Sequence, residues 1–188
     1  MSSSAISRFP VPELADLPED IRARILKVQD KSGFVPNVFL ALAHRPDEFR
    51  AFFAYHDALM EKSDGLSKAE REMIVVATSA ANNCLYCVVA HGAILRIRAK
   101  NPRLSDEVAA NFWRAEITPR QRLMLDYAMK VALDSARVSD DDHQALRAHF
   151  SDDEIWDIGA IAAFFAMSNR LANAMEIRPN DEFYGLGR

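Results

Sequence analysis

Two cysteines and a histidine lie close together near the middle of this 188-residue chain. They are Cys84, Cys87 and His91, in the run NNCLYCVVAH, and the chain has no other cysteine. A Cys-x-x-Cys pair can close into a disulfide and open again, and a histidine one helical turn beyond the second cysteine can accept its proton. The types and spacing of these residues therefore predict thiol redox chemistry.

The register of these residues would bring them to one face of a helix. If a helix begins at Cys84, the two cysteines and His91 occupy positions i, i+3 and i+7. The free N–H groups of the first turn then favour a thiolate at Cys84, and the i, i+3 spacing is within reach of a disulfide. Glu72, in the preceding predicted helix, could orient His91 if the two helices pack side by side. Tyr86 places a hydroxyl between the cysteines and is a possible member of a proton relay.

Two other interpretations of the same residues stay open. The four side chains Glu72, Cys84, Cys87 and His91 could ligate zinc. A second cysteine pair is missing, however, and three ligands on one helix would crowd a tetrahedral site. The cysteines could also be buried and inert, since free cysteine is often a core residue. The other histidines (His44, His56, His143 and His149) are expected to be structural, and Glu70 and Glu154 to be helix caps.

Composition favours one acidic globular domain. The chain is long enough for one good core, and its net charge of −4 gives no general attraction to nucleic acid or anionic membranes. No apolar run reaches the roughly 18 residues that a membrane span needs, and residues 1–8 lack the apolar core of a secretory signal. The predicted location is the reducing cytoplasm, where a cysteine pair is more often catalytic or metal-binding than structural.

Nearly every segment is predicted to be helical, because the alternation typical of strands is absent. Capping boxes beginning at Ser67, Thr118 and Ser151 mark three helix starts. Asn82 and Asn83 are expected to cap the helix that carries the cysteines. The predicted helices begin at Pro18, Asn37 and Pro46, then cover about 68–81, 84–99, 105–113, 118–134 and 140–150, and a last one follows Ser151 and ends before Pro179 and a tail.

These helices group into one domain over residues 1–188. It comprises N-terminal helices at about 18–62, a unit with the Cys-x-x-Cys pair at 67–100 and a second, degenerate unit at 118–178. The capping boxes at Ser67 and Ser151 stand 84 residues apart, and this offset sets Cys84 against Ser168. The second unit would then be a repeat that lost its reactive groups. Coincidence is the alternative, because capping boxes are common.

The motif Glu72, Cys84-x-x-Cys87-x-x-x-His91 resembles the alkylhydroperoxidase D (AhpD)-like branch of the carboxymuconolactone decarboxylase superfamily. Four further segments resemble its subgroup of uncharacterised peroxidase-related proteins, and the likeness covers most of the chain. The resemblance implies an all-α, AhpD-like helical fold with a duplicated helical unit, assembled as a homo-oligomer (dimer, trimer or hexamer). The further segments are GFVPN at 33–37, the helix after Pro46, Asn169-Arg170 and RPN at 178–180.

The resemblance also implies an antioxidant oxidoreductase that reduces hydroperoxides with its redox-active cysteines. Cys87 would be the peroxidatic thiol, His91 and Glu72 its proton relay, and Cys84 the resolving thiol. No cofactor would be bound; an external dithiol or protein reductant, with a lipoyl group as one candidate, would reset the pair. Tyr86 stands where well-known members carry a relay histidine. A phenol with a pKa of about 10 is a weak base at neutral pH, so we expect a shorter relay.

We therefore predict a thiol-dependent peroxidase. The first alternative is a thiol–disulfide oxidoreductase or redox sensor without real peroxidase activity. The second is a zinc-binding or structural oligomerisation module. A decarboxylase is least favoured, because that branch of the superfamily does not need the cysteine pair.

Overall fold

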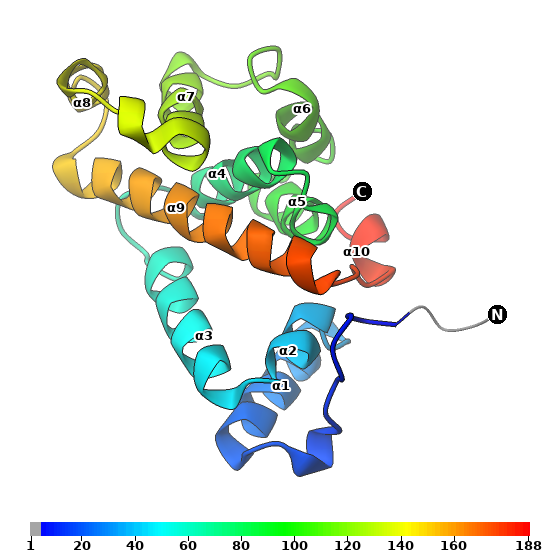
Figure 1. Ribbon diagram of the computed structural model, residues 1–188. Helices are drawn as coiled ribbons and strands as arrows, with labels where there is room; N and C mark the ends of the chain where they lie inside the picture. The colour runs from blue at the N-terminus through cyan, green and yellow to red at the C-terminus, as the bar shows by residue number, and fades with distance from the viewer. Residues whose placement is uncertain (1–4) are drawn as a thin grey trace.

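The computed structural model describes residues 5–188, and these form ten α-helices and two short 3-10 segments (Figure 1). No strand occurs in that part of the chain, so the predicted all-α fold is confirmed. The α-helices are α1 (Glu19–Ser32), α2 (Asn37–Leu42), α3 (Pro46–Met60), α4 (Lys68–Ala81), α5 (Leu85–Ala99), α6 (Leu104–Asn111), α7 (Pro119–Asp134), α8 (Asp140–Arg147), α9 (Asp152–Met175) and α10 (Glu182–Gly185).

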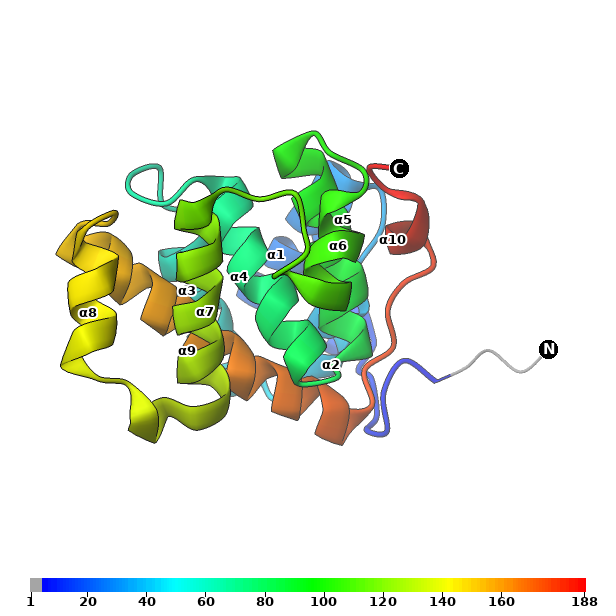
Figure 2. The ribbon, with the colours of Figure 1, turned by 90° about the horizontal axis from the view of Figure 1, so that it is seen from above.

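The 24-residue helix α9 crosses the middle of the molecule. Helices α1 to α3 lie on one side of it, and α4 to α8 lie on the other (Figure 1). Seen from above, α8 lies at one end, and α10 lies at the other, near the C-terminus (Figure 2). Both sides pack on α9, because α3, α4 and α7 all contact it. None of these helices is long and apolar enough to span a membrane.

Helices α1 to α3 enclose a small core of their own. Gly33 ends α1 in the left-handed conformation at φ +84°, which glycine adopts without strain. Pro46 begins α3 at the first helical position, where its missing N–H is harmless. Phe53 of α3 stacks on Phe39 of α2 with the ring centroids 4.2 Å apart, and it lies 4.6 Å from the Phe49 ring. These aromatic contacts hold α3 against α2.

The main core lies between α4, α7 and α9. Their capping boxes set where these helices begin, as predicted: the side chains of Ser67, Thr118 and Ser151 each accept a hydrogen bond from the third backbone N–H of their helix. The apolar side chains behind these caps are almost fully buried; among them are Met73, Ile74, Val75, Val76, Met124, Leu125, Ile158, Ile161 and Phe165.

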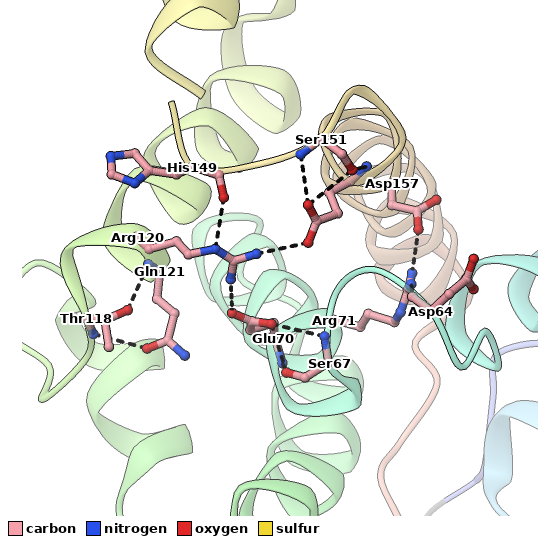
Figure 3. A network of polar contacts seen from close by, with 11 residues as sticks. Asp64, Ser67, Glu70, Arg71, Thr118, Arg120, Gln121, His149, Ser151 and Asp157 are labelled. Atoms are coloured by element: carbon pink, nitrogen blue, oxygen red, sulfur yellow. Dashed lines mark hydrogen bonds and ion pairs between the residues drawn. The ribbon is translucent and has the colours of Figure 1, made fainter. Parts of the chain in front are cut away.

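One arginine joins two of these capping boxes (Figure 3). Arg120 of α7 donates to Glu70 of α4 at 2.5 Å, to Glu154 of α9 at 3.0 Å and to the His149 carbonyl at 3.2 Å. Glu70 and Glu154 also accept the backbone N–H of the serine that opens their box. The prediction that these glutamates are caps is thus confirmed, and the Arg120 guanidinium neutralises both carboxylates.

The structure corrects several predicted boundaries: α6 ends at Asn111 and α8 at Arg147, before the predicted ends at 113 and 150. Cys84 itself, and not Asn82 or Asn83, is the N-cap of α5; Asn82 ends α4 and Asn83 turns the chain with φ +52°. The predicted tail after Pro179 contains the short helix α10. Its Phe183 is buried, and its ring centroid lies 5.0 Å from that of Phe34. Burial of this one aromatic side chain explains why the tail is ordered against the body of the molecule.

The proposed repeat, with its offset of 84 residues, would align the two separate helices α4 and α5 with the single continuous helix α9. The turn at residues 82–84 that separates α4 from α5 corresponds to residues 166–168, which lie inside α9. The repeat and the division into units at 18–62, 67–100 and 118–178 stay predictions.

Candidate functional site

The cysteine pair lies at the first turn of α5. Cys84 is held before the helix by its own N–H, which donates to the Ser79 carbonyl at 2.9 Å. Its sulfur accepts the backbone N–H of Cys87 at 3.4 Å. Both cysteines are free thiols, with exposed fractions of 1% and 2%. The predicted effect of the helix N-terminus on Cys84 therefore has a direct structural basis.

His91 and Glu72 meet between α5 and α4. The Nδ1 atom of His91 lies 2.8 Å from Glu72 Oε2, so the structure brings together the two side chains that the sequence placed nineteen residues apart. The side chain of Glu72 is only 2% exposed. The other carboxylate oxygen lies 3.8 Å from the Arg98 guanidinium, on the same helix as His91. A buried carboxylate in this position holds the imidazole in one orientation.

The two thiols differ in acidity. A hydrogen bond from the Cys87 thiol, together with the backbone N–H of Cys87, lowers the pKa of Cys84 to about 7. The same contact with Cys84, together with burial, raises the pKa of Cys87 well above its usual value. The pair thus loses its first proton most readily at Cys84, as the helix N-terminus leads one to expect.

Two buried polar residues next to the sulfurs were not predicted as site residues. The Asn169 side chain of α9 donates to Ser79 Oγ of α4 at 3.0 Å, and both residues are fully buried. Hydrogen bonding by Asn169 lowers the pKa of both cysteines, and Ser79 does the same at Cys87. The available sequence signal was an asparagine within the largely apolar α9; its partner could be found only by packing α9 against α4.

Cys87 lines a cavity of about 140 Å³, and Cys84 does not. Five of its lining residues carry polar side-chain groups: His56, Tyr86, Cys87, His91 and Ser168. The others are apolar and come from α2, α3, α5, α9 and the tail; they include Phe39, Phe52, Phe53, Phe165, Ile177 and Phe183. The Cys87 thiol and the His91 imidazole therefore line the same, mainly apolar cavity.

His56 of α3 is part of this cavity, although its sequence context predicted a structural role. Its Nδ1 atom lies 3.1 Å from Asp57 Oδ1. The ring centroids of His56 and His91 are 6.5 Å apart. No short spacing relates the two residues in sequence, so only the packing of α3 against the body of the molecule reveals their proximity.

Tyr86 is placed to support the structure, not to accept a proton. Its hydroxyl accepts the backbone N–H of Val38 at 3.4 Å, and its ring is 4% exposed. Burial, opposed only in part by this hydrogen bond, raises the pKa of Tyr86 further above its usual value. A phenol of this kind stays neutral, so the geometry favours anchoring of α2 over a place in the relay.

The zinc interpretation does not fit the geometry. Among residues 5–188, no group of three or more histidine, cysteine, aspartate or glutamate side chains is arranged to hold a metal ion. Nδ1 of His91 is already engaged by Glu72.

One family model matches part of the chain, and two solved structures match nearly all of it. The sequence model of the carboxymuconolactone decarboxylase family matches residues 46–111, which span α3 to α6. An AhpD-core, uncharacterised peroxidase-related protein from Ralstonia eutropha JMP134 is 68% identical, with a TM-score of 0.97 over 99% of this chain and 98% of its own. An uncharacterised peroxidase-related protein from Silicibacter sp. TM1040 is 39% identical, with a TM-score of 0.93 over 100% and 99%.

A more distant structure shares the fold alone. The debrominase Bmp8 is 19% identical to this chain, with a TM-score of 0.78 over 96% of this chain and 95% of its own. No curated protein matches the chain.

Proposed function

Because the chain belongs to the AhpD-like, peroxidase-related proteins of the carboxymuconolactone decarboxylase family, we propose that it is a thiol-dependent peroxidase that reduces organic hydroperoxides. The observation that carries this proposal is the position of Cys87. Its thiol borders an apolar cavity together with His91, and Glu72 contacts Nδ1 of His91.

In the first step, Cys87 becomes a thiolate and attacks the peroxide. Glu72 accepts the Nδ1–H of His91, which leaves Nε2 to take the thiol proton. The sulfur attacks the terminal oxygen of ROOH, so that an S–O bond forms and the O–O bond breaks. The alkoxide leaves and takes up a proton to become ROH. Cys87 is oxidised to a sulfenic acid.

In the second step, Cys84 resolves the sulfenic acid. Its thiolate attacks the Cys87 sulfur, an S–S bond forms, and the hydroxyl leaves with a proton as water. Before the first step, while Cys87 is still a thiol, the pKa of about 7 keeps much of Cys84 ionised at neutral pH. An external dithiol then reduces the disulfide through two exchange reactions, and a lipoyl group is one candidate donor.

The assignment of Cys87 as the attacking thiol rests on position and not on acidity. Cys84 is the more acidic of the two, but only Cys87 borders the cavity. A thiol with a higher pKa gives a more nucleophilic thiolate once a base has removed its proton, and His91 is the base at hand.

The cavity favours small apolar hydroperoxides. Its volume of about 140 Å³ is close to that of an apolar engineered cavity, ~150 Å³, which stays dry and binds benzene. Hydrogen peroxide gains little from such a lining, whereas tert-butyl hydroperoxide can bury its alkyl group there.

The proposal also covers the location, cofactor requirement, assembly and partners of the enzyme. We place the enzyme in the reducing cytoplasm, with no bound cofactor, as a homo-oligomer whose partners are the hydroperoxide and the reductant. The competing function is thiol–disulfide exchange without real peroxidase activity, and the acidic Cys84 thiol is the observation that favours it.

A peroxidase assay with a panel of donors tests the proposal. Wild-type protein, Cys87→Ser and Cys84→Ser are each supplied with tert-butyl hydroperoxide and lipoamide, thioredoxin or glutathione. We expect multiple turnovers by the wild type with a dithiol donor and no turnover by Cys87→Ser. Cys84→Ser should reduce one equivalent of peroxide and stop at the Cys87 sulfenic acid, because the resolving thiol is missing. Peroxide reduction no faster than by a free dithiol, with rapid disulfide exchange, would show that the competing function is correct.

A further inference from the structure

We propose that His56 is a second catalytic residue of this cavity, the general acid that protonates the oxygen leaving the hydroperoxide. The inference rests on the proposed peroxidase function and adds a role that His91 does not fill. In that mechanism His91 removes a proton from the thiol, and the alkoxide takes one up as the O–O bond breaks.

The position of His56 suits it to meet the far oxygen of a peroxide. It comes from α3 and lines the same cavity as Cys87 of α5, and its centroid lies 6.5 Å from that of His91. The ring of Phe165 packs against both imidazoles, with centroid distances of 4.8 Å to His91 and 6.1 Å to His56. The spacing leaves the two imidazoles separate, with room for a small molecule to contact both.

His56, like His91, contacts a carboxylate at Nδ1, although the side chain of Asp57 is 41% exposed and that of Glu72 only 2%. Asp57 lies 3.1 Å from His56 Nδ1 and is bound in turn by the Arg24 guanidinium at 3.0 and 2.9 Å. The hydrogen bond with His56, followed by the contact with Arg24, lowers the pKa of Asp57, so this carboxylate is charged. The contact with Asp57 holds the His56 ring by Nδ1 and leaves Nε2 as the atom from which a general acid would donate.

The remaining polar groups of the cavity do not serve as this acid. Tyr86 donates poorly because burial raises its pKa, and its hydroxyl is already an acceptor for Val38. A serine hydroxyl such as that of Ser168 is a far weaker acid than an imidazolium. His56 is therefore the cavity residue whose chemistry fits the task.

His56 also connects the cavity to solvent. It belongs, with Phe39 and Phe53, to the wall shared by the cavity and a surface cleft of about 720 Å³. Arg24 and Asp57 line that cleft, and the His56 side chain is 22% exposed. A proton given to the substrate can therefore be replaced from water on the cleft side without passing the thiols.

With His91 as the base and His56 as the acid, every proton in the peroxide reduction step is accounted for. Cys87 gives its proton to His91 and attacks the terminal peroxide oxygen. As the O–O bond breaks, the leaving RO⁻ takes the Nε2 proton of His56 and departs as ROH, while Cys87 becomes the sulfenic acid. His91 ends protonated and His56 ends neutral, and exchange with solvent restores both.

The test compares leaving groups that differ in their need for a proton. An alkoxide from tert-butyl hydroperoxide is a strong base and needs one, whereas the acetate released from peroxyacetic acid does not. Single-turnover oxidation of the cysteine pair is followed for wild type, His56→Gln and Asp57→Asn, with exposed His44→Gln as the matched control. Circular dichroism and thermal melting verify that each variant is folded.

We expect His56→Gln to lose about 10²-fold in rate with tert-butyl hydroperoxide and to stay close to wild type with peroxyacetic acid. Asp57→Asn, a positioning residue, should lose less and show the same selectivity, and His44→Gln should match wild type. Equal losses with both peroxides, or no loss with either, would overturn the role of His56 while Cys87-dependent peroxidase activity stands. A wild-type protein no faster than a free dithiol would overturn both proposals together.

Discussion

The Glu72 carboxylate lies 2.8 Å from Nδ1 of His91, and this contact decides which ring nitrogen is left for the thiol. With Nδ1 donating to a buried anion, Nε2 carries the lone pair. The relationship crosses from α4 to α5, so the site depends on how these two helices pack and not on the Cys-x-x-Cys motif alone.

Replacing this anion should impair the thiol chemistry while leaving the fold intact. Glu72→Gln keeps the shape but replaces the carboxylate that accepts from Nδ1 and orients His91, so we expect the peroxide-dependent rate to fall by about tenfold or more. Stopped-flow oxidation of the reduced protein measures this rate. Glu116→Gln, at an exposed position, is the control and should match wild type. An unchanged rate in Glu72→Gln would remove this residue from the relay.

The acidity of Cys84 should depend on its neighbour. Alkylation of each cysteine, resolved by peptide mass spectrometry as a function of pH, should show Cys84 reacting with an apparent pKa of about 7. In Cys87→Ala the largest cause of the shift is gone, so the pKa should rise toward the usual thiol value and labelling at pH 7 should slow. Cys87→Ser, whose hydroxyl can still donate, should stay closer to wild type. Identical profiles in all three proteins would contradict this account.

Arg120 should affect stability directly, and activity only through the packing of α9 on α4. Its removal in Arg120→Ala leaves Glu70, whose side chain is 11% exposed, without a counter-charge, and it removes the contact of the guanidinium with the Phe150 ring at 4.0 Å. We expect the free energy of unfolding to fall by about 1–3 kcal/mol, measured by urea denaturation. The control Arg147→Ala removes an exposed pair with Asp152 and should change stability little. A loss of activity without a loss of stability would contradict this division.

Phe183 should set the size of the substrate that the cavity admits. It is buried and lines the cavity from the tail, so Phe183→Ala should enlarge the space and lower the free energy of unfolding by about 3 kcal/mol or more. The ratio of rates for cumene hydroperoxide and tert-butyl hydroperoxide should rise. Tyr184→Ala, at the neighbouring exposed position, is the control and should leave the ratio unchanged. An unaltered ratio in Phe183→Ala would show that the substrate binds elsewhere.

Local signals predicted the helices well, because capping is a property of a few adjacent residues. The box at Ser67 placed α4 at residues 68–81, the range that the structure shows. The same kind of reasoning failed at Asn82 and Asn83, because asparagine is favoured at an N-cap and also in the left-handed turn that Asn83 adopts. Sequence preference alone could not decide between these two uses.

The site was predictable only where it lies on adjoining segments. Cys84, Cys87 and His91 share one helix, and Glu72 lies on the helix before it, so spacing was informative. His56 and Asn169 come from α3 and α9, and helices that meet only through tertiary packing leave no regular spacing in the chain. Both residues were therefore missed as parts of the site.

Arg120 has one more consequence, which concerns the alignment of α9 with α4. A helix whose first turn is pinned cannot slide or rotate along its neighbour, and a shift of one residue would turn every side chain by about 100°. The guanidinium pins the first turns of both helices to one point. From that common origin Asn169 lies more than four turns along α9, yet it reaches Ser79 beside the sulfurs. Arg120, far from the sulfurs, thus fixes the register of α9 on α4 and with it the position of Asn169 beside the thiols.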